Sequence, residues 1–88
     1  MRIRDGYMIR RVADMHVVIG IGSGNYAPDR IMSLNDAGAF LWGLMEQDTD
    51  PEMLTEALTG EYNVDPETAR KDVEVFLNDV RKAGLLAE

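Results

Sequence analysis

A helix cap that directly follows a short apolar strand limits the fold of this chain more than any other sequence feature. The strand-like segment ends at Leu34, and the side chain of Asn35 can accept a hydrogen bond from a free amide in the first turn of a helix. Apolar side chains then recur at helical spacing and form one face: Ala37, Phe40, Leu41, Leu44 and Met45. The junction therefore predicts a change from β to α structure at Asn35.

Size and composition are those of an ordinary globular domain. The 88 residues are 45% hydrophobic and include no cysteine, which excludes a disulfide framework or a thiolate metal site and fits a reducing compartment. No apolar run approaches the roughly 20 residues that cross a bilayer, and charged residues near the N-terminus replace the apolar core of a signal peptide. We therefore expect one cytoplasmic domain over residues 1–88.

The formal net charge of −7 is distributed unevenly along the chain. Residues 31–69 contain no lysine or arginine but many aspartates and glutamates, whereas the cations lie toward the two ends. The cations that follow this acidic stretch are Arg70, Lys71, Arg81 and Lys82. The middle of the protein is therefore expected to be acidic.

Three segments in the first part of the chain have the residue pattern of strands. Residues 7–12 and 15–21 flank a tight turn at residues 13–14, and we expect them to pair as an antiparallel hairpin. One face of the second strand is shared by Met15, Val17, Ile19 and Ile21. Turn-forming residues fill positions 22–29, and a short third strand is predicted over residues 30–34.

Two further helices are predicted where an aspartate precedes a Pro-Glu pair. Asp50 and Asp65 can cap these helices, and the prolines suit the first helical position because an amide there has no partner in any case. The second helix is expected to bury Met53, Leu54, Ala57, Leu58 and Tyr62. The third is expected to bury Ala69, Val73, Phe76, Leu77, Val80 and Ala83. Gly84 would end this helix, and the two leucines after it would return to the core.

The order of these elements predicts an α+β fold. Strands come first and helices second, so we expect a three-stranded antiparallel sheet that three helices cover on one side. A three-helix unit with short connections beside a small sheet is also the arrangement of winged-helix domains. The sequence therefore predicts a winged-helix-like domain.

Catalytic, nucleotide and metal sites find little support in the sequence. The one histidine, His16, lies within a strand, and without cysteine neither a nucleophile–base pair nor a soft-metal site can be assembled in the usual way. The glycine-rich residues 20–24 lack the Lys-Ser/Thr pair and the following helix of a phosphate-binding loop. Asp48, Asp50 and Glu52 alternate like calcium ligands but lack the glycine and the distal glutamate of a complete loop. We expect no enzyme activity, cofactor or metal.

A winged-helix shape raises DNA binding as an alternative function. Such a domain would meet the duplex with its second helix and the start of its third, and its affinity would come from lysine and arginine contacts to phosphates. These elements instead carry acids as far as Arg70: Glu52, Glu56, Glu61, Asp65 and Glu67. Salt-sensitive binding to duplex DNA would support this alternative, and its absence at low salt would exclude it.

A series of short motifs runs in a characteristic order from residue 34 to residue 86. They are Leu34-Asn35, Ala37-Gly38-Ala39, Leu41-Trp42, Leu54 to Leu58, Tyr62-Asn63-Val64-Asp65-Pro66-Glu67 and Ala83-Gly84-Leu85-Leu86. Each motif alone is a cap or a piece of core. Their order and spacing together resemble the coenzyme PQQ synthesis protein D family, whose members are also called RiPP recognition elements.

The resemblance implies a binding protein that does no chemistry itself. By this resemblance the chain would be an adaptor that binds the leader segment of a ribosomally made precursor peptide and presents its core to a modifying enzyme, often a radical SAM protein. The leader would add as a strand to the third β-strand, in the groove between that strand and the third helix. An edge strand offers unpaired N–H and C=O groups for such pairing, and adjacent apolar pockets select side chains.

Carried onto this chain, the resemblance implies a peptide-binding groove with two walls. The edge strand would be Arg30, Ile31, Met32, Ser33 and Leu34. The opposite wall would be a flank of the last helix with Arg70, Glu74, Leu77 and Arg81, and with Val73 at its floor. The arginines of this set would suit a peptide that carries acidic residues. Pro28 cannot donate to a ladder, which shortens the expected edge.

The same open edge permits a different use, in which a second copy of the chain pairs with residues 30–34. This dimerisation module would show a concentration-dependent mass in sedimentation. Nothing in these motifs identifies PQQ as the product, because domains of this kind serve many peptide pathways.

Overall fold

The three helices begin at the capping residues that the sequence predicts. In the computed structural model, which describes residues 1–20 and 32–87, the helices are α1 (Asp36–Leu44), α2 (Pro51–Tyr62) and α3 (Pro66–Lys82). The side chains of Asn35, Asp50 and Asp65 each accept a hydrogen bond from the backbone amide three residues later, over 2.8, 2.8 and 2.7 Å. Each cap satisfies an amide that the helix itself leaves without a partner.

The cap at Asp65 makes part of the stability depend on pH. Its carboxylate accepts a hydrogen bond from the Thr68 backbone amide, and this bond, together with the Thr68 hydroxyl, holds the pKa of Asp65 below its usual value of 3.8. Because the folded-state pKa is lowered, the contribution of the cap is complete above the usual value and is lost as the pH falls through the folded-state value. We expect Asp65→Asn to flatten the acid limb of the stability profile, measured by urea unfolding at several pH values. A wild-type profile no steeper than that of the variant would contradict this role of the cap.

An antiparallel sheet of three strands precedes the helices in the chain, in the order β2-β3-β4. Its strands are β2 (Tyr7–Val12), β3 (Met15–Gly20) and β4 (Ser33–Leu34). The predicted hairpin is confirmed, with Val12 paired to Met15 across the turn. Ala13 adopts a φ of 56° in this turn, in the left-handed region that favours glycine.

Of the third strand predicted over residues 30–34, the structure describes residues 32–34. It assigns Ser33–Leu34 to β4. The carbonyl oxygen of Met32 accepts a hydrogen bond from the Val18 amide over 2.9 Å, so the pairing with β3 extends one residue before the strand. Residues 21–31, which include Pro28, Arg30 and Ile31, lie outside the described part of the chain.

A second sheet, which the sequence analysis does not predict, joins the two ends of the chain. It pairs β1 (Arg2–Ile3) with β5 (Leu86–Ala87) in antiparallel register. Strands of two residues are too short to show the alternation on which a sequence prediction depends. The predicted return of the chain after Gly84 is confirmed, because Gly84 has a φ of 76° and Leu85 is 1% exposed.

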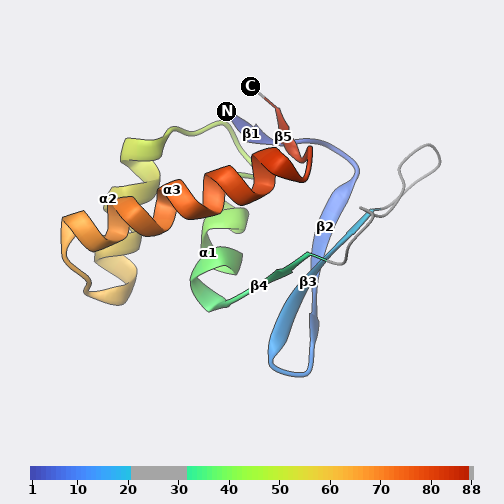
Figure 1. Ribbon diagram of the computed structural model, residues 1–88, viewed down its shortest axis with the longest axis horizontal. Helices are drawn as coiled ribbons and strands as arrows, with labels where there is room; N and C mark the ends of the chain where they lie inside the picture. Colours follow the sequence, from blue (N-terminus) through green and yellow to red (C-terminus); the bar gives the residue numbers. More distant parts are fainter. Residues whose placement is uncertain (21–31, 88) are drawn as a thin grey trace.

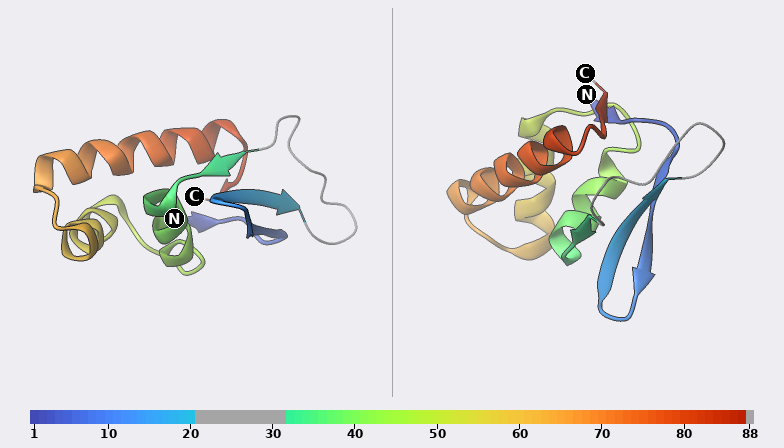
Figure 2. Two further views of the ribbon diagram at one scale, coloured as in Figure 1. Left: turned by 90° about the horizontal axis from the view of Figure 1, so that it is seen from below. Right: turned by 45° about the vertical axis from the view of Figure 1, so that its right-hand side comes forward.

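The helices and the hairpin form two sides of the molecule. Figure 1 shows α1 between the β2–β3 hairpin and α2, with α3 crossing the helical side. Figure 2 shows β4 beside the C-terminal half of α3. The predicted α+β class, with three helices after a three-stranded antiparallel sheet, is confirmed, whereas the winged-helix likeness stays a prediction. Within the described ranges, every helix is too short or too polar to cross a membrane.

The core lies between the helices and one face of the hairpin. Val18 is 3% exposed and belongs to the core cluster, whereas Met15, on the opposite face of β3, is 50% exposed. The face that the sequence assigns to Met15, Val17 and Ile19 is therefore the outer face of the sheet, and Ile21 lies outside the described residues. Strand alternation identifies two faces but not which of them meets the helices.

Three core predictions on the helices are wrong. Leu44, Met53 and Tyr62 are 37%, 55% and 40% exposed, whereas Trp42 is 1% exposed. The reason on α1 is the orientation of the helix, because Gly38 faces β4 so closely that an added Cβ would lie 3.2 Å from the Leu34 Cβ. This approach turns the buried arc toward Gly38, Leu41 and Trp42 and leaves Leu44 outside.

Candidate functional site

The open edge of β4 presents a free backbone donor and acceptor at Ser33. Val17 lies opposite Ser33 in the ladder, and the Val18 amide donates to the Met32 carbonyl. Neighbouring residues of an antiparallel strand point their backbone groups to opposite sides, so Met32 and Leu34 face β3 and Ser33 faces away from it. No described strand lies on that side of β4, because the sheet ends there. The N–H and C=O of Ser33 are therefore available to a further strand.

A groove runs between this edge and α3. Its volume is about 260 Å³. It is lined by Ser33, Leu34, Asn35, Ala37, Gly38 and Leu41 on one side and by Asp72, Val75, Phe76 and Asp79 on the other. We call it the β4–α3 groove. It lies directly beside the free backbone groups of Ser33.

The β4–α3 groove has an apolar floor and an acidic rim. Leu34, Leu41 and Phe76 are 8%, 1% and 7% exposed and form the floor as part of the core. On the α3 rim, Val75 is 62% exposed and stands between the exposed carboxylates of Asp72 and Asp79. Such a surface can accept one apolar side chain of an extended peptide and attract cationic groups beside it.

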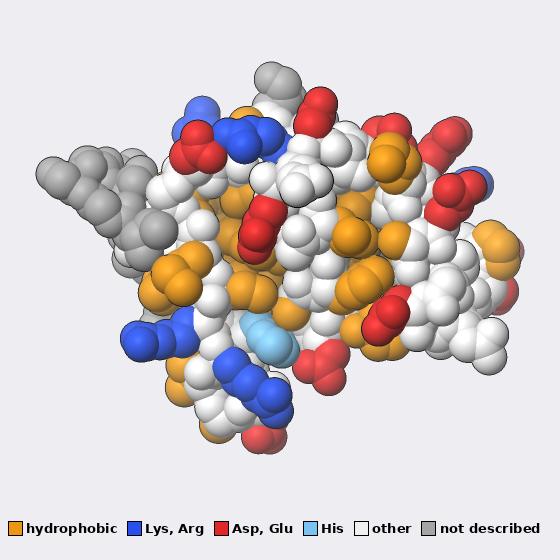
Figure 3. Space-filling model, turned by 180° about the vertical axis from the view of Figure 1, so that it is seen from behind, with side chains coloured by type: hydrophobic (Ala, Val, Ile, Leu, Met, Phe, Trp, Pro, Cys, Tyr) orange, Lys and Arg blue, Asp and Glu red, His pale blue; other side chains and the backbone are white. Residues whose placement is uncertain are grey.

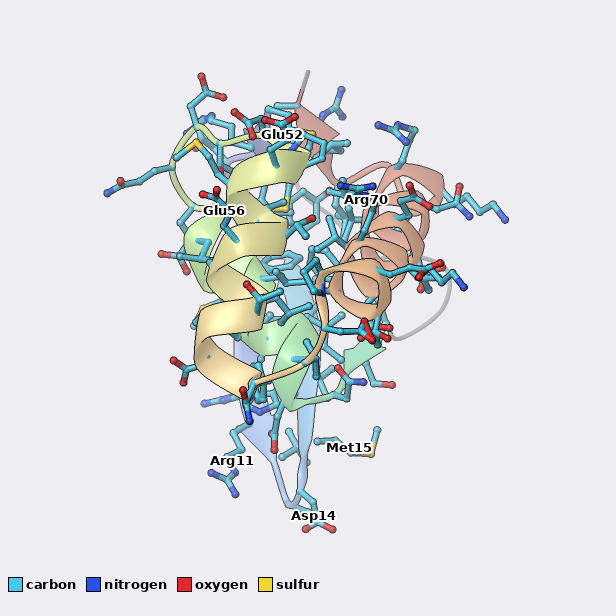
Figure 4. All side chains as sticks on the ribbon, turned by 90° about the vertical axis from the view of Figure 1, so that its left-hand side faces the viewer. Arg11, Asp14, Met15, Glu52, Glu56 and Arg70 are labelled. Atoms are coloured by element: carbon cyan, nitrogen blue, oxygen red, sulfur yellow. The ribbon has the colours of Figure 1, made fainter. Side chains whose placement is uncertain are left out.

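A second groove, of about 430 Å³, lies between α2 and α3. It is lined by Pro51, Glu52, Thr55, Glu56 and Thr59 from α2 and by Pro66, Arg70, Val73 and Glu74 from α3. Figure 4 shows Arg70 on the α2 side of α3, and places Arg11, Asp14 and Met15 at the far end of the molecule, at the hairpin tip. We call this depression the α2–α3 groove. Its lining within the described residues comes from the two helices alone, without a strand.

Charged side chains are distributed unevenly over the molecule. Figure 3 shows most of the cationic side chains of this face over the hairpin and near the chain termini, and most of its Asp and Glu side chains over the helical end. The exposed arginines of the hairpin are Arg10 and Arg11, on β2. The acidic residues expected in the middle of the chain are thus exposed on the folded protein, mostly at its helical end.

His16, the one histidine of the chain, contacts a carboxylate. Its Nε2 lies 3.2 Å from Oδ1 of Asp36, at the start of α1. A carboxylate can orient a histidine, but nucleophilic catalysis also needs a nucleophile bonded to the ring. Within the described ranges Asp36 is the hydrogen-bond partner of the His16 side chain, and no cluster of His, Asp or Glu there could hold a metal ion.

Residues 16–86 match the family Coenzyme PQQ synthesis protein D (PqqD). This range includes most of β3, all of β4 and the three helices, and so includes both walls of the β4–α3 groove. The chain belongs to the PqqD family. The resemblance seen in the sequence motifs is thereby confirmed.

Two solved structures are similar to this PqqD family member over almost their whole length. The structure of TbiB1 in complex with the TbiA(beta) leader peptide has 26% sequence identity and a TM-score of 0.72, and the match covers 100% of both chains. Lasso peptide synthetase B1 complexed with the leader peptide has 21% identity and a TM-score of 0.71, over 99% of this chain and 96% of that chain, and shows the shared fold. No curated protein sequence matches the chain.

The structure divides the predicted site residues of this PqqD protein between different surfaces. Ser33 and Leu34 line the β4–α3 groove, and the partly buried Met32 directly precedes them. Arg70, Val73 and Glu74 line the α2–α3 groove instead. Leu77 is 6% exposed in the core, and Arg81 is exposed in the last turn of α3; neither is among the described residues that line these two grooves. Arg30 and Ile31 lie outside the described residues, and a peptide-binding role for the whole set stays a prediction.

The flank of α3 that faces β4 carries residues that the sequence analysis does not select. These are Asp72, Val75 and Asp79, together with the core residue Phe76. Val75 is the residue that a sequence could have flagged, because it is an apolar side chain on the polar side of an amphipathic helix. Helical periodicity shows which residues share a face, but not which neighbour each flank meets.

Proposed function

We propose that this chain binds the leader segment of a ribosomally made precursor peptide by strand addition and presents it to a modifying enzyme. The observation that carries the proposal is the open edge of β4, where the Ser33 N–H and C=O face a groove with an apolar floor. The chain is similar over its whole length to TbiB1, whose structure was solved in complex with a leader peptide. This similarity supports the proposal.

Strand addition fits the chemistry of this edge. Main-chain hydrogen bonds to Ser33 would hold any extended peptide, whatever its sequence. Alternate side chains of that peptide would point toward the groove floor at Leu34, Leu41 and Phe76 and supply selectivity. The bound segment would be short and extended, as expected for a leader that has no fold of its own.

In this proposal, residues 1–88 form a single adaptor domain that acts in the cytoplasm and catalyses no reaction. The family resemblance favours a radical SAM protein as the modifying enzyme, and the lasso peptide synthetase structure of the same fold offers a second class. Either enzyme would receive the precursor from the adaptor, so neither requires a catalytic residue here. The product of the pathway, PQQ or another peptide-derived compound, depends on those partners.

Two other functions are alternatives to leader binding. A second copy of the chain could pair with β4, and a mass that rises with concentration and falls on adding peptide would show that the two uses compete. DNA binding is disfavoured because the helices that would meet the duplex expose Glu52, Glu56 and Glu67.

The test of the proposal is a titration of isotope-labelled protein with the leader peptides encoded beside its gene. We expect saturable binding, with the largest amide shifts at Ser33, Leu34, Val75 and Phe76, because these residues surround the incoming strand. Thr55 and Glu74 in the α2–α3 groove serve as internal controls and should shift little. Shifts confined to the α2–α3 groove would reject strand addition at β4, and an absence of binding to every such peptide would reject the function.

A further inference from the structure

We propose that Asp72 and Asp79 select leader segments in which two basic residues flank an apolar residue. This inference rests on the proposed function and names the chemistry of the peptide that the β4–α3 groove accepts. The predicted arginines suggest a peptide that carries acidic residues, whereas this inference requires basic ones. The expectation changes because the helix flank that faces β4 carries these two aspartates and not Arg70.

The two carboxylates stand on one line along the groove. Asp72 and Asp79 are seven residues apart on α3, which is close to two helical turns, so both point to the same side and lie ~10.5 Å apart along the axis. Val75 and Phe76 lie between them on the same wall. Along the α3 rim, an acidic side chain is therefore followed by apolar side chains and then by a second acidic side chain.

An extended peptide can match this order with alternate side chains. Side chains on one side of a strand repeat every ~6.7 Å, so the first and the fifth residue of a segment lie ~13 Å apart with one same-side residue between them. The two outer side chains of the peptide are spaced slightly more widely than the two carboxylates are along the helix axis. Lysine and arginine side chains are long enough to bend inward and make up this difference. The matching segment is Lys/Arg-x-apolar-x-Lys/Arg, with its apolar side chain against Val75 and Phe76.

Most other aspartates of the described chain already have structural partners. Asp50 and Asp65 cap helices, Asp5 pairs with Arg2, and Asp36 contacts His16. Asp72 and Asp79 form no side-chain hydrogen bond or ion pair with another described residue. Their charges therefore support neither a cap nor a surface pair within that part of the chain, and they remain available to a ligand in the groove.

The experiment is a selection of displayed random peptides against the full chain and two variants. The first variant is Asp72→Asn/Asp79→Asn. The second, Glu52→Gln/Glu56→Gln, removes the same amount of charge from the α2–α3 groove and is the matched control. We expect the wild type and the control to enrich Lys/Arg-x-apolar-x-Lys/Arg, and the aspartate variant to lose the basic positions while retaining the apolar one. All four substituted side chains are exposed, so folding is expected to be unchanged, which circular dichroism checks.

Titration of one selected peptide then measures the effect. The aspartate double variant should bind about tenfold more weakly than the wild type, and its binding should depend less on salt. The control should bind as the wild type does. Equal affinity of all three proteins would overturn the role of the aspartates.

The failure of this inference differs from the failure of the proposed function. Enriched peptides that compete with one another at the groove but lack basic residues, or carry acidic ones, overturn the inference and leave strand addition standing. Enriched peptides that still bind after Ser33→Pro, or a selection that enriches nothing, overturn the proposed function and the inference with it.

Discussion

Replacing Trp42 by alanine is expected to lower the free energy of unfolding by about 3–5 kcal/mol, the range for truncating a large aromatic side chain in a core. Trp42 is 1% exposed and is the largest fully buried side chain in the described chain. A small domain has only about 5–15 kcal/mol of net stability, so the variant should be close to unfolding. Urea unfolding followed by circular dichroism measures the change, because the variant loses the one tryptophan that fluorescence would report.

Leu44→Ala is the matched control for this prediction. Leu44 is on the same helix, but it is 37% exposed, so its truncation should cost less than about 1 kcal/mol. Similar losses for the two variants would mean that α1 is not oriented with Trp42 inward. A much larger loss of stability for Leu44→Ala than for Trp42→Ala would mean that the helix face predicted from the sequence, with Leu44 inside, is the buried one.

Replacing Ser33 by proline is expected to weaken leader-peptide binding at least about tenfold, because the ring removes the open-edge amide and its bulk blocks the approach of a strand. The Ser33 backbone faces away from β3, so the substitution removes no hydrogen bond from the β3–β4 ladder. Fold and stability should therefore change little. Calorimetric titration of the wild type and the variant with the same peptide gives the ratio of affinities.

Ser33→Ala separates the backbone from the side chain at this position. Alanine keeps the amide, so its affinity should stay within about twofold of the wild type if the peptide pairs with the main chain. If alanine and proline weaken binding equally, the serine hydroxyl carries the interaction and strand addition is wrong. If neither weakens it, the peptide binds elsewhere.

The sequence predicts local features of the fold well, because each depends on residues close together in the chain. Asn35, Asp50 and Asp65 cap the helices where expected, and the hairpin turn lies at its predicted position. A cap needs only one side chain and an amide three residues later. The pairing of β1 with β5 escapes prediction because it joins opposite ends of the chain.

The candidate site is predicted only on its strand side. Ser33 and Leu34, which the family resemblance selects as part of the edge strand, line the β4–α3 groove. The α3 wall is different, because the angle at which α3 passes β4 decides which flank faces the groove. That angle places Asp72 and Asp79 opposite Ser33 and turns Arg70 toward α2.

The sequence by itself determines the order of the three-stranded sheet and the three helices, the caps, the acidic middle and the family, since these follow from local residue chemistry and from motif order. Only the tertiary structure decides which face of each element is buried and which flank of α3 meets the open edge. Periodicity defines faces relative to an element's own axis, whereas contacts depend on how the axes pack together. For this protein, that packing sets the charge of the groove wall and so the kind of peptide we expect it to bind.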